Sequence, residues 1–153
     1  MPQPSPGTPA PDIELRTDRD EPFRLSSLRG KNVVLYFYPK ADTPGCTKEA
    51  CAFRDDSPKL EAANTVVVGV SPDKPGAQAR FKEKFGLPFT LLADVEHKAA
   101  EAYGVWVQKS MYGKKYMGVE RATFIIGPDG NIKKVFPKVK VEGHAAEVLA
   151  ALA

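Results

Sequence analysis

Two cysteines, Cys46 and Cys51, are the side chains of this sequence whose type and spacing best suit covalent chemistry. They follow an apolar run, residues 33–38, and the residues just before them predict the start of a helix. Thr43 suits the N-cap, and Pro44 suits the first helical position because its missing N–H would have no partner there. Cys46 then lies in the first turn, where unpaired amides and the helix dipole favour a thiolate. The pattern predicts that Cys46 is a nucleophile; the alternative is a small buried side chain.

The spacing between the two cysteines predicts a helix that has to open. Five residues of α-helix separate the two Cα atoms by roughly 8–9 Å and place them on different faces. A disulfide requires its Cα atoms within about 7 Å of each other. If Cys46 and Cys51 bond, the first turns of the helix must unwind in each cycle, so this helix should be only locally stable. The alternative for Cys51 is a packing residue beside Ala50 and Phe53.

The histidines do not suggest a metal site. The sequence has two, His97 and His144, which lie far apart, and the cysteine spacing does not fit a zinc finger. We therefore expect neither a metal nor another cofactor. Both histidines are expected to be exposed on helices, and a Cys–His catalytic pair stays open without local support.

Composition and charge predict a single globular domain. The 153 residues are 42% hydrophobic, which is enough for a core without disulfide staples. We expect one domain over residues 1–153, with a Pro-rich arm at residues 1–11. The 22 basic and 19 acidic residues are interleaved, so nucleic acid is not expected as a partner. The locally basic stretch 109–115 is interpreted as a solvated loop.

The amino-terminal segment and the apolar runs predict a cytoplasmic protein. Residues 1–15 have neither a basic start nor an apolar core, so we expect no secretion signal. The longest strongly apolar run, residues 33–38, is far shorter than the about 20 residues that a membrane span needs. In the reducing cytoplasm a cysteine pair is more often catalytic or redox-sensing than a static staple.

Hydrophobic patterns predict alternating strands and helices in the first two thirds of the chain. Residues 33–38 and 66–70 are short apolar runs typical of central parallel strands. Between them, residues 45–63 have helical spacing, with Pro58 placed to kink or end the helix. A second helix is expected over residues 76–85, ended by Gly86, and a further strand over residues 90–93.

The last third of the chain predicts a hairpin between two helices. Asp94 can cap a third helix, which Gly104 would end. The runs 122–126 and 132–136 flank Gly-Pro-Asp-Gly, a composition typical of a β-hairpin. Residues 143–153 complete the chain as a helix. The order of elements predicts an α/β fold of thioredoxin-like architecture, with a mixed central β-sheet and helices on both faces.

The cysteine segment also carries a resemblance to a known family. Pro39-xxx-Thr43-xx-Cys46 resembles the peroxiredoxin signature. Phe37-Tyr-Pro-Lys together with Thr43-Pro-Gly-Cys-Thr is similar to the Q-type, or bacterioferritin comigratory protein, subgroup. The similarity continues through three further stretches and so covers nearly the whole chain: residues 103–106, 109–118 and 121–124. It implies a thioredoxin-like fold, with Cys46 as the peroxidatic cysteine and Cys51 as an intramolecular resolving cysteine.

The resemblance also implies roles for three other residues, and these roles make chemical sense. Peroxide cleavage places negative charge on the departing oxygen, so hydrogen-bond donors are needed around the sulfur. The Thr43 hydroxyl and the Cys46 amide can donate, and Arg121 resembles the family's active-site arginine, whose planar fork can hold thiolate and peroxide together. Pro39 is expected to cover Cys46 from water. Without the resemblance, Arg121 would be interpreted as a surface residue at the start of a strand; the residues at 48 and 49 are expected to be solvated.

The predicted activity is that of a thiol-dependent peroxidase acting on hydrogen peroxide and organic hydroperoxides. The Cys46 thiolate attacks the peroxide and becomes a sulfenic acid, Cys51 condenses with it, and thioredoxin or a similar dithiol reduces the disulfide. We expect a monomer or a weak homodimer. One alternative is a thiol–disulfide oxidoreductase, although such enzymes normally use Cys-x-x-Cys and this chain has Cys-x-x-x-x-Cys. The other is a redox-switch or holdase-like binding protein.

Overall fold

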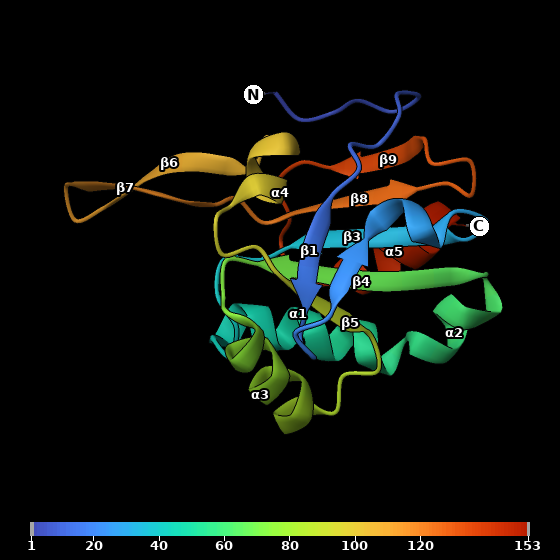
Figure 1. Cartoon of the computed structure of the whole chain (residues 1–153), viewed down its shortest axis with the longest axis horizontal. Helices are drawn as coiled ribbons and strands as arrows, with labels where there is room; N and C mark the ends of the chain where they lie inside the picture. Colours follow the sequence, from blue (N-terminus) through green and yellow to red (C-terminus); the bar gives the residue numbers. More distant parts are fainter. Residues whose placement is uncertain (1, 153) are drawn as a thin grey trace.

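A computed structural model describes residues 2–152, which fold around a seven-stranded mixed sheet and a separate two-stranded hairpin (Figure 1). The strands are β1 Glu14–Thr17, β2 Pro22–Arg24, β3 Asn32–Phe37, β4 Thr65–Ser71, β5 Thr90–Ala93, β6 Trp106–Met111, β7 Lys114–Val119, β8 Ala122–Ile126 and β9 Ile132–Phe136. The large sheet has the order β2-β1-β5-β4-β3-β8-β9, and β6 pairs with β7 alone. The strands β3, β4 and β5 run parallel, whereas β8 pairs antiparallel with both β3 and β9.

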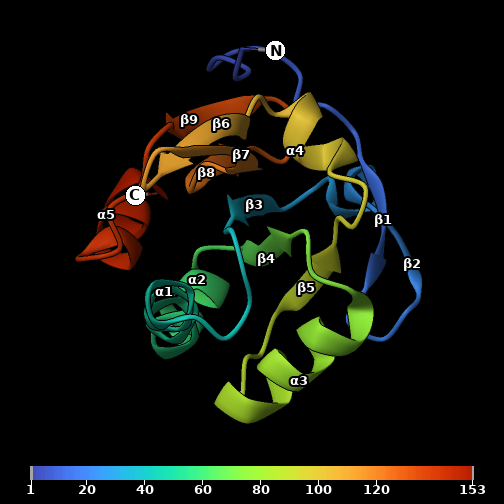
Figure 2. The same ribbon diagram turned by 90° about the vertical axis from the view of Figure 1, so that its left-hand side faces the viewer.

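Helices cover both faces of the sheet (Figure 2). They are the 3-10 turn η1 Leu25–Leu28 and the α-helices α1 Pro44–Asp55, α2 Ser57–Ala62, α3 Pro75–Phe85, α4 Lys98–Ala102 and α5 His144–Leu152. Alternation along β3 sends Tyr36 and Tyr38 into the core beneath α1, and Leu35 and Phe37 into the core shared with α4. Because both faces are covered, β3 is a nearly continuous apolar run. Within residues 2–152, no helix combines the length and the apolar character that crossing a membrane requires.

The elements that carry the site agree with the sequence predictions. The strands β3, β4, β5, β8 and β9 lie where they were predicted. Pro58 interrupts the first long helical segment, as expected: α1 ends at Asp55, and α2 begins with Pro58 in its first turn. Gly86 ends α3 with a left-handed backbone, φ 60°. Asp94 does accept the amides of Ala99 and Ala100, but α4 begins only at Lys98, later than predicted.

Two pairs of strands were not predicted, and for one of them the expectation was wrong. The stretch 109–115 is not a loop: it forms the centre of the β6–β7 hairpin, with Tyr112 and Gly113 as the turn. This hairpin extends beyond the body of the molecule in Figure 1, so most of its side chains have no core to face. Without a buried face, its sequence shows no alternation of apolar and polar residues. The strands β1 and β2 are short and half-exposed, which weakens their pattern as well.

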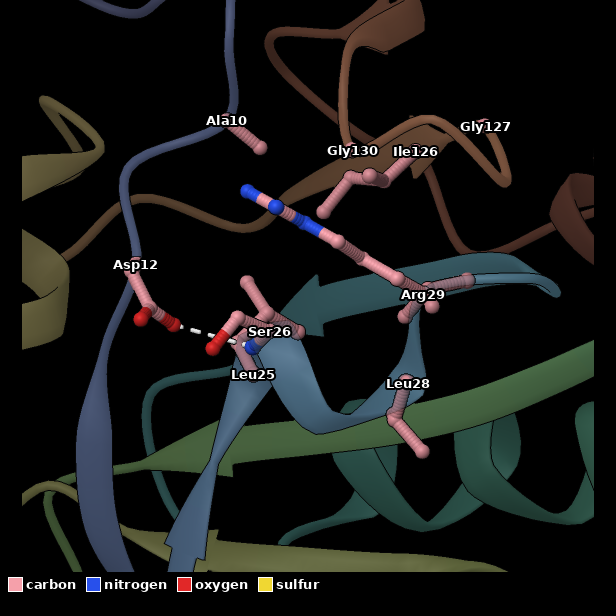
Figure 3. Close-up of a pocket in the computed structure, with 10 residues that line it drawn as sticks. Ala10, Asp12, Leu25, Ser26, Leu28, Arg29, Ile126, Gly127 and Gly130 are labelled. Atoms are coloured by element: carbon pink, nitrogen blue, oxygen red, sulfur yellow. Dashed lines mark hydrogen bonds between the residues drawn. The ribbon is translucent and has the colours of Figure 1, made fainter.

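The Pro-rich arm lies along the free edge of β9, as an edge segment. Pro9 forms a bridge with Asn131, and the Gly7 amide donates to the Ile132 carbonyl at 2.8 Å. Behind the arm is a small hollow that the Arg29 side chain crosses, while Asp12 accepts the Ser26 amide at 2.9 Å (Figure 3). The hollow adjoins the start of β3 and the end of β8 and contains neither cysteine. The arm therefore covers the free edge of the sheet along β9.

Candidate active site

Cys46 lies in the first turn of α1, under the end of β3. Its residue is 1% exposed and packs among Tyr36, Ala50 and Phe53. Thr43 is the N-cap residue, as predicted, but its hydroxyl donates to the Lys40 carbonyl at 2.8 Å and accepts no amide of the helix. No backbone or side-chain acceptor among residues 2–152 takes the Cys46 amide. That donor remains free for an anion at the start of the helix.

Arg121 reaches Cys46 from the neighbouring strand. Its Nη2 lies 3.3 Å from the Cys46 Sγ although the two residues are 75 positions apart. The pairing of Phe37 in β3 with Ala122 in β8 brings the two residues to one edge of the sheet. The Arg121 side chain is only 17% exposed. A permanent cation thus stands beside the sulfur in a mostly buried position, where charge interacts more strongly than in water.

Gly45 makes room for this contact. A Cβ atom at position 45 would stand 3.3 Å from the Arg121 Nη2. Any larger side chain would therefore press on the guanidinium that holds the sulfur. The sequence contained the glycine next to the cysteine, but nothing in it indicated which side chain would occupy that space.

Glu49 is a member of this cluster, and the expectation that it is solvated was wrong. Its residue is 2% exposed, and its Oε1 accepts the Arg121 Nη1 at 2.6 Å. Burial raises the pKa of Glu49 to about 7, while the charge of Arg121 opposes the rise. Its second oxygen, Oε2, is buried without a partner. Lys48, by contrast, is exposed as expected and contacts Glu142.

Helix spacing explains why Glu49 is inside. The residue is three positions after Cys46, so it shares the face of α1 that also buries Ala50 and Phe53. A carboxyl group on an apolar helix face needs a partner. The sequence therefore contained a signal for a buried ion pair. A helical-wheel projection of this segment places the acidic residue on the apolar face of the helix.

Tyr36 adds a second unpartnered polar group beneath the cysteine. Its hydroxyl is buried without a hydrogen-bond partner, and burial raises its pKa well above 10.0, with Tyr38, Glu49 and Cys46 nearby contributing. The ring lies across β4 at Gly69, where a Cβ atom would be 2.9 Å from the Tyr36 ring and hydroxyl. Sequence reasoning assigned Tyr36 only to a buried strand.

Cys51 lies in different surroundings from Cys46. It is half-buried and its thiol is free, as is that of Cys46. Three residues further on, Arg54 donates to the Phe85 carbonyl at 2.7 Å. Because α1 is continuous from Pro44 to Asp55, helix geometry keeps the two Cα atoms roughly 8–9 Å apart. Both thiols are therefore free while the helix is wound.

The remaining predicted residues have mixed outcomes. Pro39 lies two residues after the end of β3 and is half-buried. The expectation of an exposed His144 was wrong: it is 1% exposed, and its two ring nitrogens lie 2.7 Å from the Thr123 hydroxyl and 2.7 Å from Glu147. Burial lowers the pKa of His144, against the effect of Glu147. His97 is half-buried and stacks on Trp106 with the ring centroids 3.9 Å apart.

This arrangement can stabilise and use a thiolate. A guanidinium contacts the sulfur, an unpaired amide lies in the same first turn of the helix, and the surrounding aromatic side chains keep water away. The same two donors can stabilise negative charge on an oxygen that leaves as the sulfur attacks.

Comparison with known protein families places the chain in a family. The AhpC/TSA family matches residues 6–135. The chain belongs to the AhpC/TSA family. Among curated relatives, a putative peroxiredoxin bcp of Coxiella burnetii is 54% identical over 95% of this chain and 97% of its own length. Peroxiredoxin Bcp of Bacillus subtilis is 52% identical over 95% and 93%.

Solved structures of AhpC/TSA relatives have the same fold. The bacterioferritin comigratory protein of Xanthomonas campestris superposes with a TM-score of 0.90 at 36% identity, covering 97% of each chain. The peroxidoxin BcpB of Mycobacterium tuberculosis gives 0.85 at 38% identity, covering 96% of this chain and 95% of its own. These relatives confirm the thioredoxin-like fold and the resemblance to the Q-type subgroup. They also identify this AhpC/TSA member as a peroxiredoxin, an oxidoreductase with thiol-dependent peroxidase activity.

Proposed function

We propose that this peroxiredoxin reduces hydrogen peroxide and organic hydroperoxides through Cys46, with Cys51 as its intramolecular resolving partner. The observation that carries the proposal is the Arg121 guanidinium, 3.3 Å from the Cys46 sulfur in a mostly buried site. The related Xanthomonas campestris protein is described by its alkyl peroxide reduction activity, which supports organic hydroperoxides as substrates here.

In the first step, the Cys46 thiolate attacks the terminal oxygen of the hydroperoxide. A sulfur–oxygen bond forms, the oxygen–oxygen bond breaks, and the departing alkoxide or hydroxide takes up a proton to become an alcohol or water, respectively. Arg121 holds the thiolate and stabilises the charge that develops on the departing oxygen. The free Cys46 amide is a second donor, and Thr43 becomes another if its hydroxyl turns away from Lys40. Pro39 limits the access of water at the end of β3.

In the second step, Cys51 attacks the Cys46 sulfenic acid and releases water, leaving a disulfide. The continuous α1 helix keeps the sulfurs on different faces, so its first turns have to unwind before this bond can form. An external dithiol, thioredoxin or a similar protein, then exchanges with the disulfide and returns both thiols. We propose that the cycle takes place in the cytoplasm, where such dithiols keep thiols reduced, in a monomer or weak homodimer.

The deciding experiment treats the reduced enzyme with one equivalent of hydrogen peroxide and maps the product by mass spectrometry. We expect a Cys46–Cys51 disulfide in the wild type and a sulfenic acid on position 46 in Cys51→Ser. Cys46→Ser should lose at least about a thousandfold in peroxide reactivity. A stable sulfenic acid on Cys46 of the wild type, with Cys51 still reduced, would contradict the resolving role.

Turnover assays separate the peroxidase from its two alternatives. A thiol–disulfide oxidoreductase would turn over a disulfide substrate faster than hydrogen peroxide. A redox-switch or holdase-like protein would consume peroxide slowly and bind or release a partner on oxidation. Rapid peroxide turnover with thioredoxin, together with slow turnover of the disulfide substrate, is the result we expect.

A further inference from the structure

The β6–β7 hairpin presents an unusual concentration of exposed apolar side chains. Of the five large hydrophobic side chains that are exposed within residues 2–152, four belong to this hairpin: Met111, Tyr112, Tyr116 and Met117. Their exposed fractions run from 44% to 99%. Methionine and tyrosine are enriched at protein–protein interfaces, where flexible thioether chains and amphipathic rings adapt to a partner.

Tyr112 at the tip of the hairpin is not explained by the needs of the fold. It forms a two-residue turn with Gly113 in which both φ angles are positive, 52° and 78°. Such turns favour asparagine or glycine at the first position, and a bulky residue there is disfavoured. The Tyr112 residue is nevertheless 99% exposed, so its ring contributes nothing to packing within this chain.

The charge of the hairpin has one sign. Between Trp106 and Val119 the sequence contains three lysines and no acidic residue. Lys109 is half-buried and donates to the Val119 carbonyl at 2.5 Å, whereas Lys114 and Lys115 at the tip are exposed. Neither Lys114 nor Lys115 forms an ion pair with an acidic residue within the described part of the chain. This cationic surface with exposed aromatic groups is therefore complementary in charge to a partner with an acidic surface.

The hairpin stands beside the edge of the sheet at which the catalytic sulfur lies. Its second strand, β7, ends at Val119, and Arg121 follows two residues later. In Figure 1 the hairpin projects from the side of the molecule where α1 begins. Tyr112 at its tip is nine positions from Arg121, a span of at most roughly 30 Å. A reductant has to contact the Cys46–Cys51 disulfide. If its interface has the usual size, the margin of that interface includes the hairpin.

We propose that the β6–β7 hairpin is the docking element for the protein dithiol that reduces this enzyme, and that this reductant carries an acidic surface beside its reactive cysteines. The inference rests on the proposed function, because only a disulfide formed by turnover needs a reductant. A second copy of this chain is a poorer occupant, since a two-fold contact through the hairpins would place like charges against each other.

The test compares a protein reductant with a small one on the full-length enzyme. The probe is a purified thioredoxin with net negative charge at pH 7; dithiothreitol serves as the small dithiol. In K114E/K115E we expect kcat/KM for thioredoxin to fall at least about tenfold and its decrease with added salt to disappear. Turnover with dithiothreitol should stay within about twofold of wild type. Tyr112→Asn introduces a residue that this turn favours. It should also lower kcat/KM for thioredoxin while leaving turnover with dithiothreitol unchanged.

A matched control makes the same change of charge elsewhere. Lys31 precedes β3 at the opposite edge of the sheet, and Lys59 lies in α2; both are exposed. K31E/K59E should behave as wild type with both reductants. An equal loss in this control, an equal loss of K114E/K115E with dithiothreitol, or unchanged kinetics of K114E/K115E would each overturn the docking role.

Two further outcomes assign the hairpin to another occupant, and either would overturn the proposal. One is a dimer in sedimentation analysis that K114E/K115E dissociates while turnover with thioredoxin is unchanged. The other is binding to phosphatidylglycerol vesicles that the same variant abolishes, again with unchanged turnover. Absence of wild-type turnover with dithiothreitol is a different result, because it would contradict the proposed function itself.

Discussion

The two cysteines of α1 share a helix but are held by different parts of the molecule. Cys46 is buried beside Arg121, which immediately precedes β8 and has Glu49 as its second contact. Cys51 is half-buried one turn and a half further on, beside Arg54. Side chains from a distant strand fix the position of the first sulfur, whereas the winding of the helix alone fixes the second.

The difference separates two tasks that the enzyme needs in sequence. Attack on a peroxide requires a sulfur in a rigid, preorganised electrostatic site. The proposed resolution requires that the same sulfur leave that site and meet Cys51, which the wound helix prevents. Substitutions near Arg121 should therefore change the first step, and substitutions that alter only helix stability should change the second.

The largest effect is expected at Arg121. Arg121→Gln removes the charge beside Cys46 and should lower the rate constant for the reaction with hydrogen peroxide by about 10²–10³-fold. Arg121→Lys keeps the charge but not the planar fork that spans Cys46 and Glu49, so it should recover only part of the loss. Stopped-flow measurement of sulfenic acid formation in a Cys51→Ser background isolates this step. Full activity in Arg121→Gln would show that Cys46 does not depend on the charge of Arg121, and so would contradict the proposed difference between the two cysteines.

The next effect is expected at Glu49 and depends on pH. Burial places the Glu49 pKa at about 7, so the carboxylate anchors Arg121 above this pH and becomes a neutral acid below it. Glu49→Gln resembles the neutral acid. It should lower the peroxide rate constant about tenfold at pH 8, the value of one charged hydrogen bond, and much less at pH 6.

The pH profile of the peroxide reaction checks this expectation, with Glu61→Gln on the exposed surface of α2 as control. The wild-type and Glu49→Gln curves should converge as the pH falls through about 7 and diverge as it rises. Parallel curves would show that Glu49 does not anchor Arg121 through its charge.

A smaller effect is expected at Lys48, which lies between the cysteines on the exposed side of α1. Lys48→Ala and Lys48→Gly both remove the contact with Glu142 but differ by about 1 kcal/mol in helix propensity. If unwinding limits resolution, the disulfide should form up to about fivefold faster in the glycine variant. Rapid quench and mass spectrometry measure this rate. The same pair of changes at Lys59 in α2 should give equal rates, and equal rates at Lys48 would mean that winding does not control the step.

The smallest effect is expected at His144, which supports the far end of α1 through Phe53, with ring centroids 5.8 Å apart. Burial lowers the His144 pKa below its ordinary value of 6.5, so the folded protein binds fewer protons there than the unfolded chain. Stability from this group is present above about pH 6.5 and is lost as the pH falls, with a slope of at most about 1.4 kcal/mol per pH unit.

Urea denaturation at pH 7.5 and pH 5 measures the His144 contribution. His144→Gln should lose less stability than wild type between the two values. A steeper loss in His144→Gln would contradict the assignment of a buried neutral imidazole.

The sequence predicted the parts of this fold that have a buried face. The strands β3, β4 and β8 are continuous apolar runs, and the turn Gly-Pro-Asp-Gly marks the β8–β9 hairpin, so local patterns were sufficient. The β6–β7 hairpin was not predicted because polar and apolar residues do not alternate along its two strands. Its turn is Tyr112-Gly113 in place of the Asn-Gly that signals a hairpin.

The catalytic thiol could be proposed from its local segment, but its surroundings could not. The Thr43-Pro44 pair predicts the start of a helix, and this alone indicates Cys46. The contacts of Arg121 and Glu49 depend on which strands pair, and His144 is buried only because α5 folds against Thr123. From the sequence alone, polar and charged side chains of this kind are expected to be exposed to solvent. Their burial becomes evident only when the contacts between strands and helices are known.

The antiparallel placement of β8 beside β3 also affects the order in which the enzyme is made. Cys46 emerges during synthesis 75 residues before the cation that faces it. A nascent chain that stops short of β8 has the nucleophile but lacks its electrostatic support, so we expect it to meet oxidants as an ordinary thiol does. Reactivity is thus delayed until the last third of the polypeptide has been translated and has paired.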